Sequence, residues 1–456
     1  MKKSYKRYVV GMCLLITVLV VISSCDGSEE KPKQVDHIPA GRDLEIVIAT
    51  DTHYLSQSIN DRGEAFKQFV ANGDGKQLMY SDELIRALDY QVRLRKADIV
   101  LFSGDLSNNG EEKSHLDLST RLKEMEGGGT RVYVVPGNHD VLNPWARKFE
   151  GENQYEIDSI SPKEFNQIYG DFGYKEALDV DSDSLSYLAA PSEDVWLLML
   201  DTAQYDQNSK LGYPQLDGKL SSSTLKWILK CGKMASDSGA TLVAVMHHNL
   251  IPHSEMISKG FTINNSSETV DILQRAGVSL VFSGHSHLQD IASTDNKGTN
   301  IIYDVAGGAL SVYPHLFGTL HYSVSNHTFN YSINQLNVDI WANEYGTTDP
   351  NLLQFDLFST KSSEALWQYK YFNMLSSKAE FKNFSDSDLK SMVQTIGLMN
   401  RIILSGANPV QISEVLNSEG YQLWKDAPKG TPFRSYIMNM AEMGGKDNIN
   451  LQVTIP

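Results

Sequence analysis

The sequence predicts an α/β protein with a helical region at its C-terminal end. Up to about residue 282, six short apolar runs alternate with segments that have the amphipathic spacing of helices. Near-continuous runs of Val, Ile and Leu of this length are typical of strands buried on both faces. Beyond about Gly346 the pattern is helical. Because strands alternate with helices over the first part, that part is predicted to be an α/β domain.

The six apolar runs are the predicted strands of this domain. They are Leu44–Ala49, Ala97–Phe102, Val132–Val135, Val195–Leu200, Thr241–Met246 and Val278–Phe282. Helices are predicted between them at Ser81–Lys96, Ser114–Met125, Ser222–Ala235 and Ser267–Ala276. A further helix begins at Ser161-Pro162, because Glu164 stands at the capping-box spacing and proline favours the first helical position.

Composition excludes several classes of function. The chain has 456 residues, with 40 Lys and Arg against 56 Asp and Glu, and its formal net charge is −16. Nucleic-acid polymers are bound through clustered basic residues, so this acidity argues against such a partner. Three cysteines exclude a disulfide scaffold, and the length suggests two or three domains of about 150 residues.

The first 25 residues have the pattern of an export signal. A basic start is followed by an apolar run from Tyr8 to Ile22, which is short for a transmembrane helix of about 20 residues. Val21–Cys25 resembles a bacterial lipobox, which implies cleavage before Cys25 and lipid attachment to its sulfur; the alternative is an uncleaved anchor. Cleavage would leave 36 basic and 56 acidic residues, a charge of −20. We therefore expect an exported bacterial lipoprotein on the outer side of the cell membrane.

Residues that can bind metals follow the predicted strands. In sheets of this class, ligands bind at the carboxyl ends of the strands. Each motif alone has an ordinary structural explanation, but motifs of this kind at five strand ends make a purely structural role improbable for the set. The fourth of the six apolar runs, Val195–Leu200, ends at a lone Asp201. The residues at the other five ends are Asp51, His53, Asp105, Asn138, His247, His285 and His287.

These residue types predict a pair of metal ions. Carboxylate, imidazole and amide ligands without thiolate suit Mn, Fe or Zn better than Ca or Mg, which prefer all-oxygen ligands. Seven side chains are too many for one ion and enough for two if one carboxylate bridges. Two ions about 3.5–4 Å apart can clamp a phosphoryl group, and a hydroxide that bridges them becomes a nucleophile near neutral pH.

The motifs resemble, complete and in order, the signature of the calcineurin-like metallophosphoesterase superfamily. The resemblance covers about residues 43 to 310, through Asp51-x-His53, Gly104-Asp105, Gly137-Asn138-His139-Asp140, His247-His248 and Gly284-His285-x-His287. It implies that Asp51, His53 and His287 hold one ion and that Asn138, His247 and His285 hold the other, with Asp105 bridging.

The resemblance also assigns roles beside the metals. It implies that His139 lies over the phosphate, where it stabilises charge or protonates the leaving oxygen, and that Asp140 orients its ring. His247 is expected to be the ligand because the family uses the first residue of this pair. His248 and Asn108 are then expected behind the ligands or facing the substrate.

The fold implied by the resemblance is two packed mixed β-sheets flanked by helices, the metallophosphoesterase fold. Alternating runs at Thr319–Val324 and Thr328–Ile333 are expected to form a hairpin that closes the second sheet against the first. The segment between Val141 and Asp194 is predicted to form either a cap beside the metals or local packing, from aromatic residues that include Trp145, Tyr155, Phe165, Tyr169, Phe172 and Tyr174. The expected organisation is a lipoprotein signal peptide over 1–24, a flexible linker over 25–42, the metallophosphoesterase domain over 43–345 and a small helical domain over 346–456.

Residues that differ from the motifs of other branches of the superfamily narrow the range of reactions to be expected. Asn108 stands where purple acid phosphatases have a Tyr ligand, and Asn109-Gly110 and Asp140 depart from protein Ser/Thr phosphatases. The resemblance is greatest to the cyclic-nucleotide phosphodiesterase-like branch, including lipoprotein members with a helical C-terminal extension. We expect hydrolysis of a phosphodiester of cyclic-nucleotide or glycerophosphodiester type; the low basic content and the lack of an evident arginine clamp favour a diester.

Two alternatives remain open from the sequence. One is a phosphomonoesterase that uses the same site, and the other is a surface-binding lipoprotein without turnover. The expected partners are a small phosphoester substrate and the membrane, reached through lipidated Cys25, and we expect a monomer.

Overall fold

The structure is a computed structural model that describes residues 37–254, 258–294, 300–442 and 447–455. The predicted export signal and the lipidation site at Cys25 lie outside these residues. Among the residues described, no helix is both long and apolar enough to cross a membrane.

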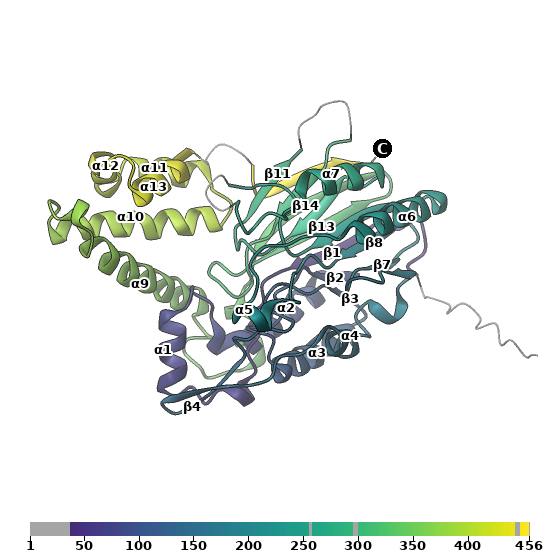
Figure 1. The fold of residues 1–456 in the computed structure, drawn as a ribbon, viewed down its shortest axis with the longest axis horizontal. Helices are drawn as coiled ribbons and strands as arrows, with labels where there is room; N and C mark the ends of the chain where they lie inside the picture. Colours follow the sequence, from purple (N-terminus) through teal and green to yellow (C-terminus); the bar gives the residue numbers. More distant parts are fainter. Residues whose placement is uncertain (1–36, 255–257, 295–299, 443–446, 456) are drawn as a thin grey trace, which may run out of the picture. The chain divides into compact units, whose positions relative to one another are not determined.

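Two mixed sheets form the core (Figure 1). The first has the order β15-β14-β13-β1-β2-β3, in which β1 (Leu44–Ala49), β2 (Ile99–Phe102) and β3 (Arg131–Val134) are parallel. Its other strands are β13 (Leu316–Ser323), β14 (Thr328–Gln335) and β15 (Asn450–Thr454). The second has the order β11-β12-β10-β9-β8-β7-β6, in which β8 (Val195–Leu200), β9 (Thr241–Met246), β10 (Leu280–Ser283) and β12 (Tyr303–Ala306) are parallel. Antiparallel strands complete the second sheet: β6 (Asp179–Val180) and β11 (Asp290–Ser293) lie at its edges, and β7 (Tyr187–Ala189) lies between β6 and β8.

The central strands are buried on both faces, which explains their near-continuous apolar sequences. In β9, Val243 and Val245 point into the core between the sheets, whereas Leu242, Ala244 and Met246 point to the helices on the outer face. Successive side chains of a strand point to opposite faces, so a strand covered on both sides has no polar position.

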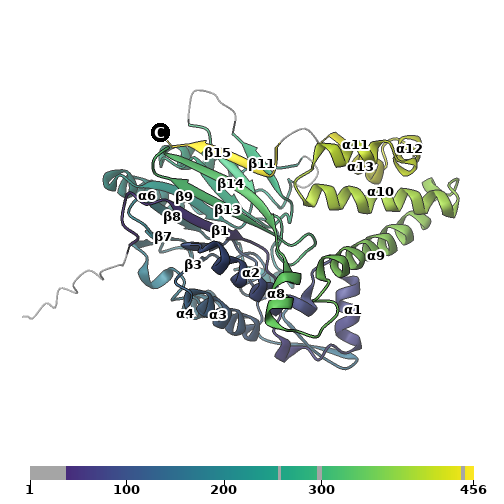
Figure 2. The same ribbon diagram turned by 180° about the vertical axis from the view of Figure 1, so that it is seen from behind.

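Helices cover the outer face of each sheet (Figures 1 and 2). On the second sheet, α6 (Ser222–Ser238) and α7 (Ser266–Arg275) contribute apolar residues at helical spacing, and Ser221 caps α6 by accepting from Thr224 N. On the first sheet the covering helices include α2 (Ser81–Arg95) and α3 (Glu112–Glu126). The capping box predicted at Ser161 is present at the start of α4 (Pro162–Ile168). The α/β class with two packed mixed sheets is therefore confirmed.

The hairpin predicted near residues 319–333 forms, but in the other sheet. β13 (Leu316–Ser323) pairs with β14 (Thr328–Gln335) and also pairs antiparallel with β1. It therefore extends the first sheet instead of closing the second. The physical reason is that β1 is apolar on both faces, and pairing on both sides satisfies the backbone groups that an edge strand would leave open.

The C-terminal region is helical up to Glu442 and then ends in a strand. α8 (Val338–Tyr345) and α9 (Phe355–Ser376) lead into α10 (Asp386–Leu404), α11 (Pro409–Leu416), α12 (Glu419–Asp426) and α13 (Pro432–Glu442), which share a small core around Trp424. In both views α10 to α13 gather at one end (Figure 2).

The strand after these helices was not expected. β15 (Asn450–Thr454) pairs antiparallel with β14, and Val453 is buried against the main core. The alternation of Leu451, Val453 and Ile455 is a strand pattern that distinguishes these residues from the helices before them. The expected helical domain over 346–456 thus does not extend to its last residues.

Some short elements lie outside the two large sheets. They include α1 (Glu64–Asn72) and a separate two-stranded hairpin of β4 (Arg147–Glu150) and β5 (Asn153–Glu156). The short helix α5 (Asn208–Leu211) follows β8.

Candidate metal centre

The predicted ligands meet at the carboxyl ends of the parallel strands, where the loops of the two sheets face each other. β1, β2 and β3 are neighbours in the first sheet, and β9 and β10 are neighbours in the second. The loops that follow these five strands bring together two groups of side chains whose ligand atoms lie within 4.8 Å of one another. These are Asp51, His53 and His287, and Asp105, His247 and His285. Asn138 joins the second group through its side-chain oxygen, 3.1 Å from His247 Nε2.

Five of these side chains lie on strained backbone. Asp51, His53, Asp105, His285 and His287 all have φ between 40° and 66°, a region that residues other than glycine seldom adopt. Such conformations cost of order 1–3 kcal/mol each and persist where the surroundings impose them. Their concentration in one small volume is typical of a functional site.

Two glycines are required for the loops to approach this closely. A Cβ on Gly137 would lie 2.2 Å from Asp105 Oδ1, and a Cβ on Gly284 would lie 2.0 Å from Thr50 Oγ1. Both distances are far below any real contact, so the absence of a side chain lets the loop after β3 pack on Asp105 and the loop after β10 pack on β1.

Asp105 lies between the two groups. Its Oδ2 atom is 3.3 Å from His247 Nε2 in one group and 3.7 Å from His53 Nε2 in the other. In the first group, Asp51 Oδ1 is 3.4 Å from His287 Nε2 and 3.8 Å from His53 Nε2. The position of Asp105 is the one that a bridging carboxylate would occupy.

The donor set fits two cations. His247 Nδ1–H donates to Ser103 O at 2.9 Å, so in the neutral ring Nε2 carries a lone pair. That lone pair faces two acceptors, Asn138 Oδ1 and Asp105 Oδ2. Burial disfavours the charged ring, but the Asp105 carboxylate outweighs it and raises the pKa of His247 to about 9. A positive charge is therefore favoured between these atoms, and a divalent ion supplies one.

Two further atoms support this fit. Asp51 Oδ1 is buried and has no hydrogen-bond partner among the described residues, although it lies among imidazole nitrogens. His285 Nε2–H donates to Gly260 O at 3.1 Å, which leaves Nδ1 free to bind an ion. A hydrogen bond from the far ring nitrogen is the usual way in which a metal-binding histidine is oriented.

His139 lies beside the cluster with its ring held from behind. Its Nδ1–H points to Asn108 O at 2.8 Å and to Asn109 Oδ1 at 3.0 Å, so Nε2 is left for a substrate. Its ring meets that of His53 edge on, with 5.0 Å between centroids. Burial, helped by the positive charge of Lys76 and opposed by Asp105, lowers the pKa of His139 below its usual value.

Asp140 does not orient this ring, contrary to the role given to it from the sequence. Its carboxylate accepts from the backbone N–H groups of Leu106, Ser107 and Gly137 at 2.8–3.0 Å. Burial, and then the charge of Asp105, raise the pKa of Asp140 to about 7. Asp140 therefore ties the loop after β2 to the loop after β3 and acts on the site through the backbone.

His248 and Asn108 lie next to the cluster but outside it. His248 Nε2–H donates to Leu216 O, and its Nδ1 lies 2.8 Å from Thr202 Oγ1, so both ring nitrogens have partners. Its ring packs against that of His285 at 4.4 Å between centroids. The structure thus brings His247, not His248, into the cluster, and Asn108 holds His139 through its carbonyl.

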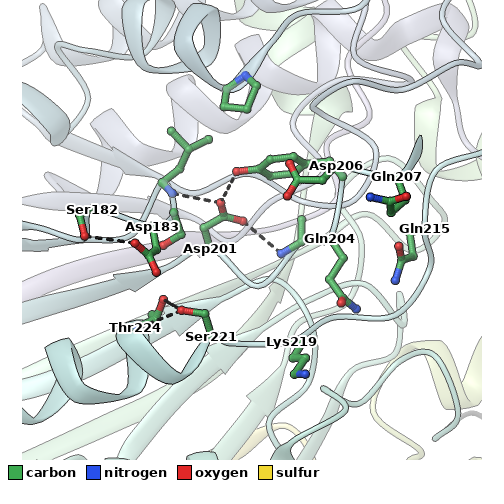
Figure 3. A pocket seen from close by; sticks show the side chains of 15 residues that line it. Ser182, Asp183, Asp201, Gln204, Asp206, Gln207, Gln215, Lys219, Ser221 and Thr224 are labelled. Atoms are coloured by element: carbon green, nitrogen blue, oxygen red, sulfur yellow. Dashed lines mark hydrogen bonds between the residues drawn. The ribbon is translucent and has the colours of Figure 1, made fainter. Parts of the chain in front are cut away.

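The sixth strand-end residue lies elsewhere. β8 is separated from β10 by β9, and Asp201 lines a different hollow, of about 520 Å³, shown in Figure 3. Its carboxylate accepts from Leu185 N, Ala203 N and Tyr205 Oη at 3.0–3.1 Å. Burial raises the pKa of Asp201 to about 6. Position at a strand end was therefore not sufficient for membership of the cluster.

The aromatic residues between Val141 and Asp194 divide between the two predicted roles. Phe165, Tyr169, Phe172 and Tyr174 are buried in the core and pack locally. Trp145 is 45 % exposed and lines a hollow of about 590 Å³ that His139 also lines.

Sequence reasoning missed three basic residues in that hollow. They are Lys76, Arg147 and Lys370. The lack of an evident arginine clamp had favoured a diester, but these residues are far apart in the chain and belong to none of the motifs. Only the meeting of remote segments could have revealed them.

The loop from Asp105 to Glu111 offers a test of stability against pH. Glu111 is buried and accepts from Asn109 N at 3.0 Å, and burial raises its pKa from 4.5 to about 7. The pKa of Glu111 is higher in the folded than in the unfolded protein. The contribution of the protonated Glu111 to stability is therefore full below about pH 4.5 and is lost as the pH rises through 7.

We therefore expect Glu111→Gln to be more stable than the native protein at pH 8, and the difference in the free energy of unfolding to be smaller at pH 5. A pKa difference of this size corresponds to roughly 3 kcal/mol at most. Urea unfolding of both proteins at the two pH values measures the difference. An equal effect at both values would show that the buried carboxylate does not titrate in this range.

Comparisons with known proteins agree with this geometry. Residues 44–289 match the model of the family described as calcineurin-like phosphoesterase, and residues 337–447 match that of the C-terminal domain of cyclic nucleotide phosphodiesterase. A probable cyclic nucleotide phosphodiesterase of Synechococcus sp. is 25 % identical over 199 residues, which are 43 % of this chain and 60 % of that protein. The match thus spans less than two thirds of the curated relative.

Solved structures of low sequence identity were also found. A dimetal phosphatase from Danio rerio is 15 % identical, with 64 % of this chain and 96 % of that chain covered and a TM-score of 0.46. GAP50, the anchor in the inner membrane complex of Plasmodium, is 9 % identical, with 64 % and 84 % covered and a TM-score of 0.34. The family match covers more than half of the chain, from β1 through the loop that carries His287. The chain belongs to the calcineurin-like phosphoesterase family of metal-dependent hydrolases.

Proposed function

We propose that the protein hydrolyses a phosphodiester, of the cyclic-nucleotide or glycerophosphodiester type, at a centre of two metal ions. The observation that supports this most strongly is the cluster of seven donor side chains with His139 beside it. The match of residues 337–447 and the name of the cyanobacterial relative favour a diester over a monoester.

The chain's own residues supply binding and proton transfer. Asp51, His53, Asp105 and His287 would hold one ion, and Asp105, Asn138, His247 and His285 the other. Such a pair of Mn, Fe or Zn ions supplies Lewis-acid stabilisation of phosphoryl charge and lowers the pKa of a bound water. His139, fixed by Asn108 and Asn109 through Nδ1–H, presents Nε2 to the leaving oxygen, and the doubly protonated ring would donate its Nε2 proton there.

The function is tested with two aryl esters. Purified protein loaded with Mn is expected to cleave bis(4-nitrophenyl) phosphate with a higher kcat/KM than 4-nitrophenyl phosphate. The reverse order would favour the phosphomonoesterase, and binding of metal without cleavage of either ester would favour a surface-binding role without turnover.

Removal of metal is expected to abolish activity and lower the melting temperature. Without ions, a buried cluster of carboxylates and imidazoles loses the charge that balances it. Each ion, at 100 times its Kd, would add about 2.7 kcal/mol of stability. Chelation, elemental analysis and re-addition of Mn measure this: about two ions per chain should return together with activity. Full activity in protein stripped of metal would refute the proposal.

The place of action is part of the proposal. The sequence of residues 1–25 supports export and anchoring through a lipid on Cys25, with a small phosphoester, not a nucleic-acid polymer, as partner and a monomer as the working state. Cys25→Ser should release the protein from the membrane fraction of cells that process lipoproteins. Unchanged membrane association would favour an uncleaved anchor.

A further inference from the structure

We propose that the hollow beside His139 binds the organic part of the substrate and selects one with an aromatic ring and a second anionic group. A nucleotide that carries a phosphate besides the one that is cleaved has this chemistry. The inference rests on the proposed function, because it names the substrate class of the same site.

The hollow adjoins the residue that faces the leaving oxygen. His139, Asn108 and Asn109 line it, and the His139 ring contacts that of the metal ligand His53. A substrate whose phosphate lies at the metal ligands would therefore place one substituent here. The volume of about 590 Å³ is within the usual range for small-molecule sites, roughly 300–1,000 Å³, and exceeds what a bare phosphate needs.

The lining is basic in a protein whose net charge is −16. Three cations, Lys76, Arg147 and Lys370, face one carboxylate, Asp74. Lys76 pairs with Asp74 at 3.1 Å, but the lysine side chain is 10 % exposed and the aspartate side chain 57 % exposed. The positive charge is thus the more enclosed of the two, and charges held in a partly enclosed hollow attract a second anion more strongly than charges in open solvent.

Arg147 is incompletely neutralised. Its guanidinium donates to the carbonyls of Pro144 and Ala146, and its carboxylate partner, Glu156, is 3.2 Å away and 84 % exposed. Exposed pairs of this kind are worth about 0–1 kcal/mol, so a phosphate could compete for the arginine. The backbone contacts hold the guanidinium in place beside the hollow.

An aromatic wall accompanies these charges. Trp145 lines the hollow and leaves 45 % of its surface exposed, and Phe69 is half-buried near it. An exposed indole beside basic groups is suited to stack on a nucleobase or another planar ring, because every such ring presents a π face.

Lys370 links the helical C-terminal region to the hollow. It lies on α9, and its Nζ donates to Asn72 O at 3.0 Å and to Gly73 O, at the end of α1. An ammonium group has three donors, so one remains for a ligand. The C-terminal region therefore contributes directly to substrate binding.

Inhibitors that differ by one phosphate test the proposal. Binding of adenosine 3′,5′-bisphosphate and of adenosine 5′-monophosphate to the metal-loaded protein is measured by calorimetry and by inhibition of bis(4-nitrophenyl) phosphate cleavage. We expect the bisphosphate to bind at least about 10-fold more tightly, as charge-assisted hydrogen bonds allow. Lys76→Gln and Lys370→Gln should each reduce this ratio toward one.

Matched variants separate the subsite from general effects. Lys361→Gln removes the same charge from an exposed position on α9 and should leave the ratio unchanged. Trp145→Ala should weaken both adenosine nucleotides relative to inorganic phosphate by about 5-fold or more, the lower end of base stacking. Lys370→Arg should retain the ratio, because the charge and the contacts to α1 remain.

The binding measurements can fail or succeed independently of the test of the proposed function. Calorimetry needs no turnover, so a protein that cleaves no diester still reports the binding ratio. Equal binding of the two nucleotides by the native protein would overturn the inference, as would a ratio that survives Lys76→Gln. If Lys370→Gln does not fold, the Lys76→Gln result decides.

Discussion

Asp105→Asn is expected to reduce both the metal content and the activity of the protein severely. Asp105 is the carboxylate whose Oδ2 reaches His247 in one group of ligands and His53 in the other. The amide that replaces it is neutral and turns either its oxygen or its NH2 group toward those nitrogens. Changes in residues behind metal ligands typically cost 10–100-fold in affinity or activity. For the bridging position itself we therefore expect a loss of more than about 100-fold in kcat and fewer than two ions per chain.

The matched control is Asp201→Asn. Asp201 is also a buried aspartate at the end of a parallel strand, but it lies in a separate hollow and holds backbone and tyrosine donors. This variant should keep about two ions and a kcat within a few-fold of the native value. Elemental analysis and steady-state kinetics on both variants provide the comparison. Equal losses in the two variants would indicate a general effect of burying an amide, not the loss of a bridging ligand.

His139→Gln is expected to lower kcat while the metal content stays at about two ions per chain. His139 is absent from the two ligand groups, and its Nδ1 is occupied by Asn108 and Asn109, so its free Nε2 serves the substrate. Positioned proton donors contribute about 10²–10⁴-fold. The loss should be larger for an alkoxide leaving group, as in adenosine 3′,5′-cyclic monophosphate, than for 4-nitrophenolate, which leaves without a proton.

The dependence on the leaving group is the decisive measurement for this prediction. A variant that loses the same factor on both substrates would show that His139 stabilises charge on the phosphate and does not protonate the leaving oxygen. His321→Gln, at an exposed position on β13, is the control and should behave as the native protein. Loss of metal from His139→Gln would instead place His139 among the ligands.

Much of the site could be predicted because the signals are local. Each ligand follows a short apolar run within a few residues, and a run such as Leu44–Ala49, with five apolar residues in six, is sufficient to indicate a strand. The chemistry of carboxylates, imidazoles and an amide then indicated the kind of metal. His247 could be preferred to His248 from the resemblance alone, and the structure shows that the partners of both His248 ring nitrogens lie away from the cluster.

The predictions that the structure corrects concern contacts that the sequence order of the residues does not reveal. Local periodicity predicted that residues 319–333 form a hairpin but could not give its sheet, because pairing with β1 depends on which edge is free. The strand β15 completes the first sheet from the far end of the chain, after a hundred residues that are mainly helical. Asp140 was assigned to the ring of its neighbour His139, whereas its carboxylate lies on backbone N–H groups of the preceding loop.

The sequence by itself determined the strands, the helices and the residues that can bind metal, because side-chain chemistry and hydrophobic period are properties of short segments. Only the tertiary structure decided which strand-end residues meet, since side chains at strand ends can turn to different hollows. Asp201 also follows a parallel strand, but its carboxylate accepts from Leu185 N, Ala203 N and Tyr205 Oη in a separate hollow. The tertiary structure also decided the basic hollow, which takes Lys76, Arg147 and Lys370 from three segments that share no motif. Charges so far apart along the chain act together only once folding has brought them to the lining of one hollow.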